Sequence, residues 1–399
     1  MALNYYFSVA PVYTAVEMLS QEASSIQLAV ESASVDASTE KFTFEHPALD
    51  LLSSPNADAT QTEFFRQMCS FYLLTGNVFM VATGPVNRPP LEIQVVNPTT
   101  VTLMAGSDGF LDIITVTTST STNMVFTRQD VDGRFRYFTQ DGNAEIWHIK
   151  TFSPRYLAGD LWGMSPLNSI YHELEQYAEA SVHNLSLLKR GARPSGALKF
   201  NDVMTDQQLQ RLQQQADSLH TGGNNAGRLL LLEGADFVEM SQSNKDMDFA
   251  KLKQDITNTI YNALRIPLPL INSEFSTYDN MSTSTINFYD QAVIPLLQRL
   301  LEELSLFLMP RFDKTGKLQL SFDPETVEAL TSRAVDQVLK IQATGVLTVN
   351  EMRHMLGYDP IEGGDFIYMN STLVPMGEGQ TDPDLMNALI GNSEPSGGR

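Results

Sequence analysis

Apolar side chains recur at helical spacing near the start of the chain. Residues 9–20 place four small or branched side chains on one helical face: Val12, Ala15, Val16 and Leu19. This spacing predicts an amphipathic helix. A second helix is predicted to begin after Thr60, which forms a capping box with Glu63, and to end at Gly76.

The pattern changes between residues 78 and 149. Short runs rich in β-branched and aromatic residues, such as "VFMVAT", "FLDIITVTT" and "AEIWHIK", alternate with Gly, Pro, Asn and Asp. Such runs predict strands joined by turns, in an antiparallel meander or a small barrel. With helices before and after it, this region makes the expected fold class α+β.

Two long helices are predicted in the middle of the chain. The first has Ser165 as its N-cap and Pro166 in the first helical position, and it extends to about Arg190. The second carries an apolar face from Phe249 to Leu264 and stops before "IPLPLIN", because proline cannot continue a helix. Between them, "PSGALKF" predicts a strand, residues 205–219 a short helix and "RLLLLEGADFVEM" a hairpin.

A polar segment, "NSEFSTYDNMSTS", follows the second long helix and is predicted to be a loop. The next helix is expected from about Ser284 to Leu308, with a kink at Pro295. Further helices are predicted near 324–343 and at "TVNEMRHML", the latter capped by Thr348 and Glu351. The composition after residue 376 favours disorder.

The net charge of the chain limits the classes of function that the sequence supports. The 399 residues carry a formal net charge of -21, whereas residues 187–265 hold ten basic and nine acidic side chains. Such acidity excludes a general nucleic-acid-binding surface, since that binding depends on Lys and Arg neutralising phosphates. It leaves open a protein that DNA passes without sticking. The single Cys69 excludes a disulfide framework and fits a reducing compartment.

Catalytic motifs are weak. "HELEQ" (172–176) lacks the second His of a zinc-protease helix, and the remaining histidines share no ligand spacing. The sequence contains no GxxxxGK[ST] phosphate loop and no GxSxG elbow. No run of 18 residues is continuously apolar, so no membrane span is predicted, and the first residues do not resemble a signal peptide. The expectation is therefore a soluble intracellular protein without catalytic function or cofactor.

Taken in order, several segments resemble the portal (head-to-tail connector) proteins of tailed bacteriophages. They are "HPALDLLSSPNADATQTEFFRQMCSFYLLTGNVFMVA" (46–82), "EIWHIKTFSPRYLAGDLWGMSPLNSI" (145–170), "LLKRGARPSGALKF" (187–200), "NAGRLLLLEGADF" (225–237), "ALRIPLPLIN" (263–272), "STINFYDQAVIPLLQRLLEEL" (284–304) and "GVLTVNEMRHMLGYDPIEGGD" (345–365). One departure is the short N-terminus, which implies that the family's first helix and strands are trimmed.

The resemblance implies a portal-type subunit with an α/β wing, a two-helix stem, a small α/β clip and a helical crown, assembling as a ring. The expected parts are a wing (1–165 with 284–323), stem helices (166–191 and 245–265), a clip (192–244), a tunnel loop (266–283), a crown (324–376) and a disordered tail (377–399).

The implied function is a channel at one capsid vertex, through which double-stranded DNA is packaged and ejected. The implied partners are other copies in a ring of about twelve, the terminase large subunit, the major capsid protein, a head-tail adaptor and transient double-stranded DNA, with no membrane. The protein would reside in the virion after assembly in the host cytoplasm.

Two sets of residues are candidates for contact with DNA. The predicted cationic ring of the stem comprises Lys189, Arg190, Arg193, Lys251 and Lys253. The predicted tunnel loop comprises Asn272, Ser273, Glu274, Phe275, Ser276, Thr277, Tyr278, Asp279 and Asn280. The alternative for "LLKRGARPSGALKF" is a helix end, where Lys189 and Arg190 complement the helix dipole and pair with acids of a neighbour.

Two other functions stay open at this point. One is a different virion ring or shell component, an adaptor or a capsid subunit. The other is a hydrolase that uses carboxylates of the β-rich region, which would require converging carboxylates in a cleft.

Overall fold

The computed structural model describes most of the chain. The described residues are 2–32, 41–85, 88–118, 123–131, 133–154, 161–189, 197–200, 235–238, 245–272, 278–342, 347–355, 358 and 360–365. Contacts divide the chain into two units, Met1–Ala329 and Leu330–Arg399.

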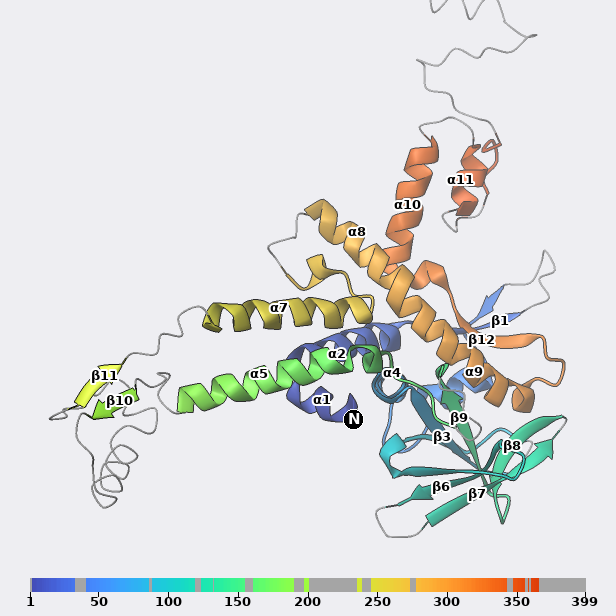
Figure 1. The fold of residues 1–399 in the computed structure, drawn as a ribbon. Coiled ribbons are helices and arrows are strands. Elements are labelled where there is room, and N and C mark those ends of the chain that lie inside the picture. Colours follow the sequence, from blue (N-terminus) through green and yellow to red (C-terminus); the bar gives the residue numbers. More distant parts are fainter. Residues whose placement is uncertain are drawn as a thin grey trace, which may run out of the picture. The chain divides into compact units, whose positions relative to one another are not determined.

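The first unit begins with four helices, drawn in blue in Figure 1. They are α1 (Ala2–Ser8), α2 (Ala10–Ser25), α3 (Pro47–Ser53) and α4 (Gln61–Thr75). The predicted apolar face of α2 is buried, and α2 packs along α4. The Thr60 hydroxyl accepts the N–H of Glu63 at 3.3 Å, and Gly76 ends α4 with φ 73°. Both predicted ends of α4 are therefore confirmed, whereas α1 was not predicted.

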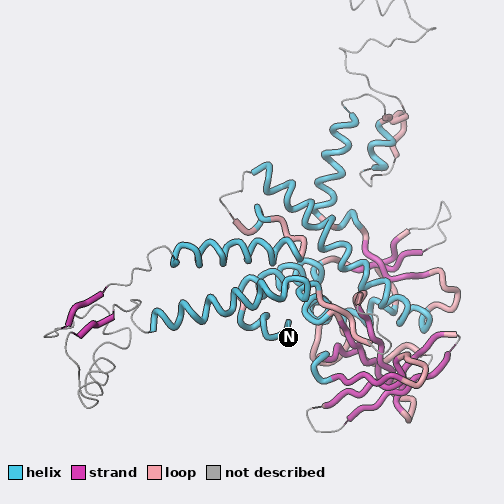
Figure 2. The backbone as a smooth tube through the Cα atoms, viewed as in Figure 1, coloured by secondary structure: helices cyan, strands magenta, loops and turns pink. Residues whose placement is uncertain are grey.

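The β-rich region forms one antiparallel sheet of seven strands, ordered β4-β3-β9-β8-β7-β6-β5. The strands are β3 Asn77–Thr83, β4 Glu92–Val96, β5 Val101–Ala105, β6 Leu111–Thr117, β7 Asn123–Val131, β8 Arg134–Thr139 and β9 Ala144–Lys150. Strands β5 to β9 follow one another as the predicted meander, and β3 lies beside β9. Figure 2 shows this sheet in magenta beside the helices.

A second sheet joins distant parts of the sequence. Its order is β12-β1-β2, with β12 at Leu318–Phe322, β1 at Leu28–Ser32 and β2 at Phe42–Thr43. Leu28 pairs with Phe322 and Ser32 with Leu318 in an antiparallel register. The N-terminal region and the segment around residue 320 therefore belong to one folded body.

A helix lies between the two sheets and contacts both. This helix, α9 (Ile294–Phe312), packs on β12 and contacts β9 of the large sheet. Near its end, the Arg311 guanidinium donates to Glu145 of β9. Arg136 of β8 donates to both oxygens of the same carboxylate at 2.6 Å. Glu145 is 3% exposed, so this charge cluster is part of the core.

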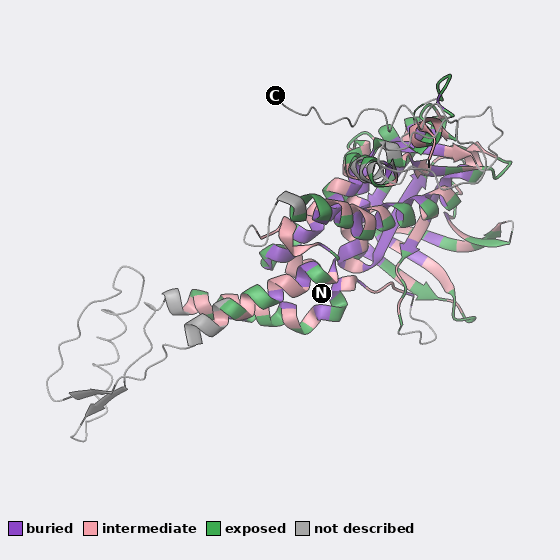
Figure 3. Ribbon diagram, turned by 90° about the horizontal axis from the view of Figure 1, so that it is seen from above, coloured by how far each residue is buried: buried purple, intermediate pink, exposed green. Residues whose placement is uncertain are grey.

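The two predicted long helices are present. Residues Pro166–Ile170 form the 3-10 turn η2, which leads into α5 (Tyr171–Lys189), and α7 spans Lys245–Ala263. Figure 3 shows buried residues concentrated in the helical layer and the sheets, while much of α5 and α7 is only partly buried or exposed. Strands β10 (Ala197–Phe200) and β11 (Ala235–Val238) pair antiparallel. The predicted short helix at 205–219 and most of "RLLLLEGADFVEM" lie outside the described residues.

The helix after the predicted loop begins earlier than expected. Helix α8 spans Tyr278–Phe288, so Tyr278, Asp279 and Asn280 are helical and the prediction that they form a loop is wrong. Asn, Asp, Ser and Thr have low helix propensity, but here α8 packs on the 3-10 turn η4 (Leu268–Leu270) and buries Ser284. Tertiary contact thus overrides the local preference.

The described residues of the second unit, taken by themselves, include two helices. Helix α10 spans Glu328–Gln342, beginning two residues before the unit boundary, and α11 spans Val349–Met355. The Glu351 carboxylate accepts the N–H of Thr348 at 2.8 Å, and the Thr348 hydroxyl accepts the N–H of Glu351 at 3.1 Å. This reciprocal pair confirms the predicted capping box. The predicted tail, 377–399, lies outside the described residues.

Candidate functional site

The 3-10 turn η2, which leads into α5, is fixed to the end of α4 by one buried serine. Ser165 is 1% exposed. Its hydroxyl donates to the carbonyl of Leu73 at 2.7 Å and accepts the N–H of Leu167 at 3.1 Å. The predicted N-cap is confirmed, and the same oxygen also anchors the helix to the body.

The segment before Ser165 is held by Asn77, at the first position of β3. The Asn77 side-chain oxygen accepts the N–H of Gly163 at 2.7 Å, and its amide donates to the carbonyls of Thr75 and Gly163 at 2.7 and 3.2 Å. A Cβ on Gly163 would lie 2.1 Å from the carbonyl oxygen of Gly76. The two backbones therefore meet too closely for a side chain, which gives α5 a defined origin.

Two ring contacts link α5 and α7 along their length. The Lys253 ammonium lies over the Tyr177 ring, 5.2 Å from its centroid. Farther from the body, the rings of His183 and Phe249 are 5.3 Å apart. Since residue numbers rise along α5 while they fall along α7, the two helices are antiparallel, and we call them the stem pair.

The predicted cationic ring falls partly within the stem pair. Lys251 and Lys253 lie on α7, where Lys251 is exposed and Lys253 is partly buried over Tyr177. Lys189 is the last residue of α5. Arg190, Arg193 and the side chain of Lys189 lie outside the described residues, so the five cations are not brought together by the described part of the chain.

The predicted tunnel loop is shorter than the sequence suggested. Asn272 lies two residues after the end of η4, and residues 273–277 (Ser273, Glu274, Phe275, Ser276 and Thr277) lie outside the described residues. The three remaining candidates belong to the first turn of α8. The connection is thus bounded by a 3-10 turn on one side and by a helix on the other.

The backbone changes its helical type just before Pro295. Residues Tyr289–Val293 form a π-helical turn, η6, and Pro295 lies in the first turn of α9. Proline has no N–H, so it cannot satisfy the carbonyl four residues earlier, that of Gln291. The Arg265 guanidinium, from a residue with φ 59°, donates to this carbonyl at 3.4 Å. The irregularity thus precedes Pro295, while the kink predicted at Pro295 stays a prediction.

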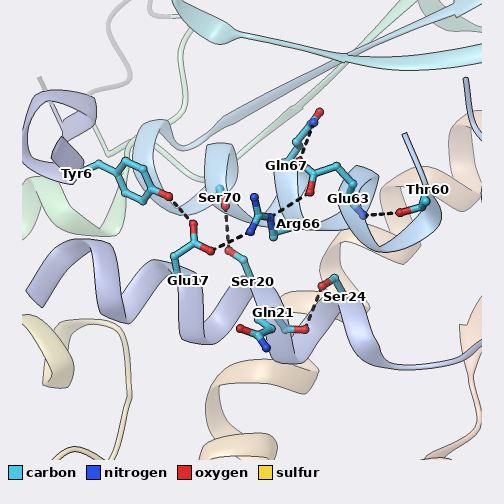
Figure 4. Close-up of polar contacts among 10 residues, drawn as sticks. All are labelled: Tyr6, Glu17, Ser20, Gln21, Ser24, Thr60, Glu63, Arg66, Gln67 and Ser70. Atoms are coloured by element: carbon cyan, nitrogen blue, oxygen red, sulfur yellow. Dashed lines mark hydrogen bonds and ion pairs between the residues drawn. The ribbon is translucent and has the colours of Figure 1, made fainter. Parts of the chain in front are cut away.

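A groove of about 430 Å³ lies between α1, α2, α4 and the turn at Asn97 and Thr99. Its polar wall is drawn in Figure 4, where the Tyr6 hydroxyl donates to Glu17. Arg66 donates to Glu17 at 3.3 Å and contacts Glu63 at 3.2 Å. Burial, together with the bond to the Glu17 carboxylate, raises the pKa of Tyr6. The charged side chains of this wall are paired with one another, so the wall presents no free reactive group to the groove. Sequence reasoning missed it because α1 was not predicted.

Signals for catalysis stay weak in the described residues. No group of three His, Cys, Asp or Glu side chains there has a geometry suited to a metal ion. His172 of "HELEQ" is exposed on α5. Burial raises the pKa of the Cys69 thiol to about 12, which suppresses its reactivity. None of the described helices combines the length and the apolar character needed to cross a membrane.

Relatives of the chain cover nearly all of it. A protein of Rickettsia bellii, described as uncharacterized, is 30% identical over 382 residues, which are 92% of this chain and 90% of the relative. A probable portal protein of Streptomyces phage phiC31 is 23% identical and covers 89% of this chain and 76% of its own length.

Solved structures give the same picture. A chain in the neck of an empty gene transfer agent (GTA) particle, computed with C6 symmetry, has a TM-score of 0.63, with 28% identity, 90% of this chain and 93% of that chain covered. A chain in the neck of a native GTA particle, computed with C12 symmetry, has a TM-score of 0.61 and 28% identity, covering 89% and 92%. The family model described as phage portal protein matches residues 10–357. This chain therefore belongs to the phage portal protein family.

Proposed function

We propose that the chain is the portal subunit of a tailed phage or a phage-like particle, in which about twelve copies form a ring at one capsid vertex. Double-stranded DNA would pass through the ring during packaging and ejection. The observation that carries this proposal is the family match over residues 10–357, across both units of the chain. The twelvefold symmetry of the GTA neck supports the copy number.

The charge of the chain suits a channel that does not retain DNA. Twelve copies at -21 each amount to roughly -250, which repels the phosphate backbone. Within the proposal, Lys189 at the end of α5, together with Arg190 and Arg193 after it in the sequence, provides a narrow cationic band that centres the duplex. Lys253 lies over the Tyr177 ring, in the contact between the two stem helices.

The proposal includes partners at both ends of the channel. In it, the clip (192–244) docks the terminase large subunit during packaging and a head-tail adaptor afterwards, while the wing contacts the major capsid protein. The helix-bounded connection after η4 faces the bore as the tunnel loop. Assembly takes place in the host cytoplasm, and the role of the protein is structural, without catalysis.

Imaging of the purified assembly tests the proposal most directly. Negative-stain electron microscopy and mass photometry are expected to give closed rings near twelve subunits. A monomer, or an icosahedral shell, would contradict a portal and favour an adaptor or a capsid subunit.

The DNA-contact hypothesis is tested separately in a packaging assay with Lys189→Glu, Arg190→Glu and Arg193→Glu. Reduced packaging by intact rings is expected. Unchanged packaging by intact rings would remove the cationic band from the proposal while leaving the ring itself in place.

A further inference from the structure

The groove between α1, α2 and α4 combines a polar wall with apolar side chains. The polar wall includes Glu17 of α2 and Glu63 and Arg66 of α4, drawn in Figure 4. The apolar part of the lining comes from α1 and α4: Leu3, Phe7, Phe71 and Leu74. A volume of about 430 Å³ lies in the usual range for ligand sites, which join apolar side chains with a few polar groups. The groove can therefore accept a group with an apolar part and a polar part.

Aromatic rings are exposed beside the groove. Phe7, which lines the groove, is 82% exposed, and Tyr13 is 50% exposed. The ring of Tyr6 joins them, because its centroid lies 5.5 Å from that of Phe7 and 5.1 Å from that of Tyr13. Scattered exposed apolar side chains need no explanation, whereas a cluster of them next to a groove indicates an interaction site. The cluster thus extends the apolar surface of the groove towards solvent.

The polar wall carries an excess of negative charge. Glu17 and Glu63 share the guanidinium of Arg66. The Tyr6 hydroxyl and the Gln67 amide, which donate to these two carboxylates, are neutral. Two carboxylates thus face one cation. The side chain of Glu63 is 41% exposed, so a cation from outside the chain can reach it. The wall therefore favours a positively charged ligand.

The wider surroundings argue against a second copy as the ligand. The first 165 residues, which include the whole groove, carry 17 acidic and eight basic side chains. The same region of another copy would bring the same net negative charge, and like charges across a contact are unfavourable. A different protein that presents basic side chains is the better match.

We propose that the groove binds a peptide segment of a partner protein in which a basic side chain lies next to an apolar one. The apolar side chain covers Phe7 and enters the groove, and the basic one pairs with the exposed carboxylate of Glu63. An arginine suits this place best, because its planar guanidinium binds a carboxylate through two parallel hydrogen bonds and also stacks on aromatic rings. This surface goes beyond the proposed portal function and does not depend on ring formation.

Binding of designed peptides to the full-length chain tests this assignment. The probes are short, capped, dye-labelled peptides: one of alternating Leu and Arg, one in which citrulline replaces Arg, and one in which Ser replaces Leu. Citrulline has nearly the shape of Arg without its charge. Fluorescence anisotropy is expected to show that the Leu–Arg peptide binds about tenfold more tightly than either of the others.

Two substitutions locate the binding at the groove. Phe7→Ala removes the exposed ring, and Glu63→Gln removes the charge while keeping the size of the side chain. Each is expected to weaken binding of the Leu–Arg peptide by roughly three- to tenfold, and Glu63→Gln should leave binding of the citrulline peptide unchanged. The matched controls, Phe110→Ala and Glu92→Gln, alter an exposed ring and an exposed acid outside the lining of the groove and should leave binding unchanged.

The outcomes decide between the possible occupants. Equal affinity for the Arg and citrulline peptides, or unchanged binding by both groove variants, would overturn the proposal, because the groove would then not be what the peptide recognises. Binding by the dissociated chain but not by assembled rings would show that a neighbouring copy covers the groove, which also overturns it. Ring imaging tests the proposed function separately. A chain that forms rings without binding the Leu–Arg peptide contradicts only this inference, and a chain that binds the peptide without forming rings contradicts only the proposed function.

Discussion

At the scale of single residues, Glu145 is a buried carboxylate that two arginines share. It lies in the core, where it accepts hydrogen bonds from Arg136 and Arg311, which come from a strand and a helix more than 170 residues apart. Burial lowers the pKa of Arg311, and the Glu145 carboxylate opposes that effect. Two arginines thus depend on one acid. Removing one partner from a buried ion pair costs more than the pair contributes, because a charge is left uncompensated.

Glu145→Gln is therefore expected to lower the free energy of unfolding by about 3 kcal/mol. Urea unfolding followed by tryptophan fluorescence measures this, since Trp147 follows Glu145 closely in β9. The matched control is Glu92→Gln, at an exposed position of the same sheet, which is expected to change stability by less than about 0.5 kcal/mol. Equal effects at the two sites would contradict the role assigned to the cluster.

His148 gives the body a predictable response to acid. Its ring stacks on Phe79 with centroids 4.2 Å apart, and its Nε2 lies 3.0 Å from the Asn77 side-chain oxygen. Burial lowers the pKa of His148 to about 3. Between about pH 6.5 and pH 3 the His148 ring is protonated in the unfolded chain, where its pKa is near 6.5, but stays neutral in the folded chain. Burial of the neutral ring therefore stabilises the fold above pH 6.5, and this stabilisation is lost as the pH falls from about 6.5 towards 3.

His148→Gln keeps a donor for Asn77 but removes the titration. The variant is expected to be less stable than the wild type at pH 7.5, and that difference should shrink by up to about 2 kcal/mol at pH 5.0. Urea unfolding of both proteins at the two pH values provides the comparison. A stability difference that does not change with pH would show that His148 is not held neutral by the fold.

Among the elements, those with local capping signals were predicted well. Thr60 and Gly76 bound α4, and Thr348 bounds α11, because each end depends on a hydrogen bond or a backbone angle that a single residue supplies. The start of α8 could not be predicted, since contact with η4 decides it. The π turn before Pro295 was likewise missed: Pro signalled an irregularity, but its form depends on the surrounding contacts.

The cap of η2, the 3-10 turn that leads into α5, offers a test at this scale. Ser165→Ala removes the acceptor for Leu167 and the donor to Leu73, so it is expected to cost about 1–2 kcal/mol. Hydrogen exchange measured by mass spectrometry should show faster exchange in the first turns of α5. Thr348→Ala, the control, removes a cap in the other unit and should leave α5 unchanged. Unaltered exchange at α5 in Ser165→Ala would contradict the anchoring role.

For the whole molecule, the family could be predicted from the order of segments, whereas the surfaces could not. The sequence indicated Lys251 as a candidate for DNA contact from its charge alone. Its direction relative to α5 follows only from the contacts of Lys253 and His183 across the stem pair. The candidate groove beside Tyr6 also depends on three helices meeting. Periodicity defines a face of a helix but not which neighbour covers it.

The division into two units predicts how the chain tolerates truncation. A chain ending at residue 329 retains β12 and is expected to stay monodisperse in gel filtration, with the unfolding midpoint of the intact first unit. A chain ending at residue 313 loses β12 and leaves one edge of β1 open, so aggregation is expected. Identical behaviour of the two truncations would contradict the assignment of β12 to the first body.

The pairing of β1 with β12 also determines when the protein can finish folding. At 5–20 residues per second, a ribosome needs roughly 15 to 60 s to make the residues between Leu28 and Phe322. The seven-stranded sheet ends at Lys150 and can close long before that, while β1 waits with one edge unpaired. Each nascent subunit therefore passes through an interval in which it can mispair with a neighbouring chain. Subunits whose synthesis is complete are the only ones that can enter an assembly correctly.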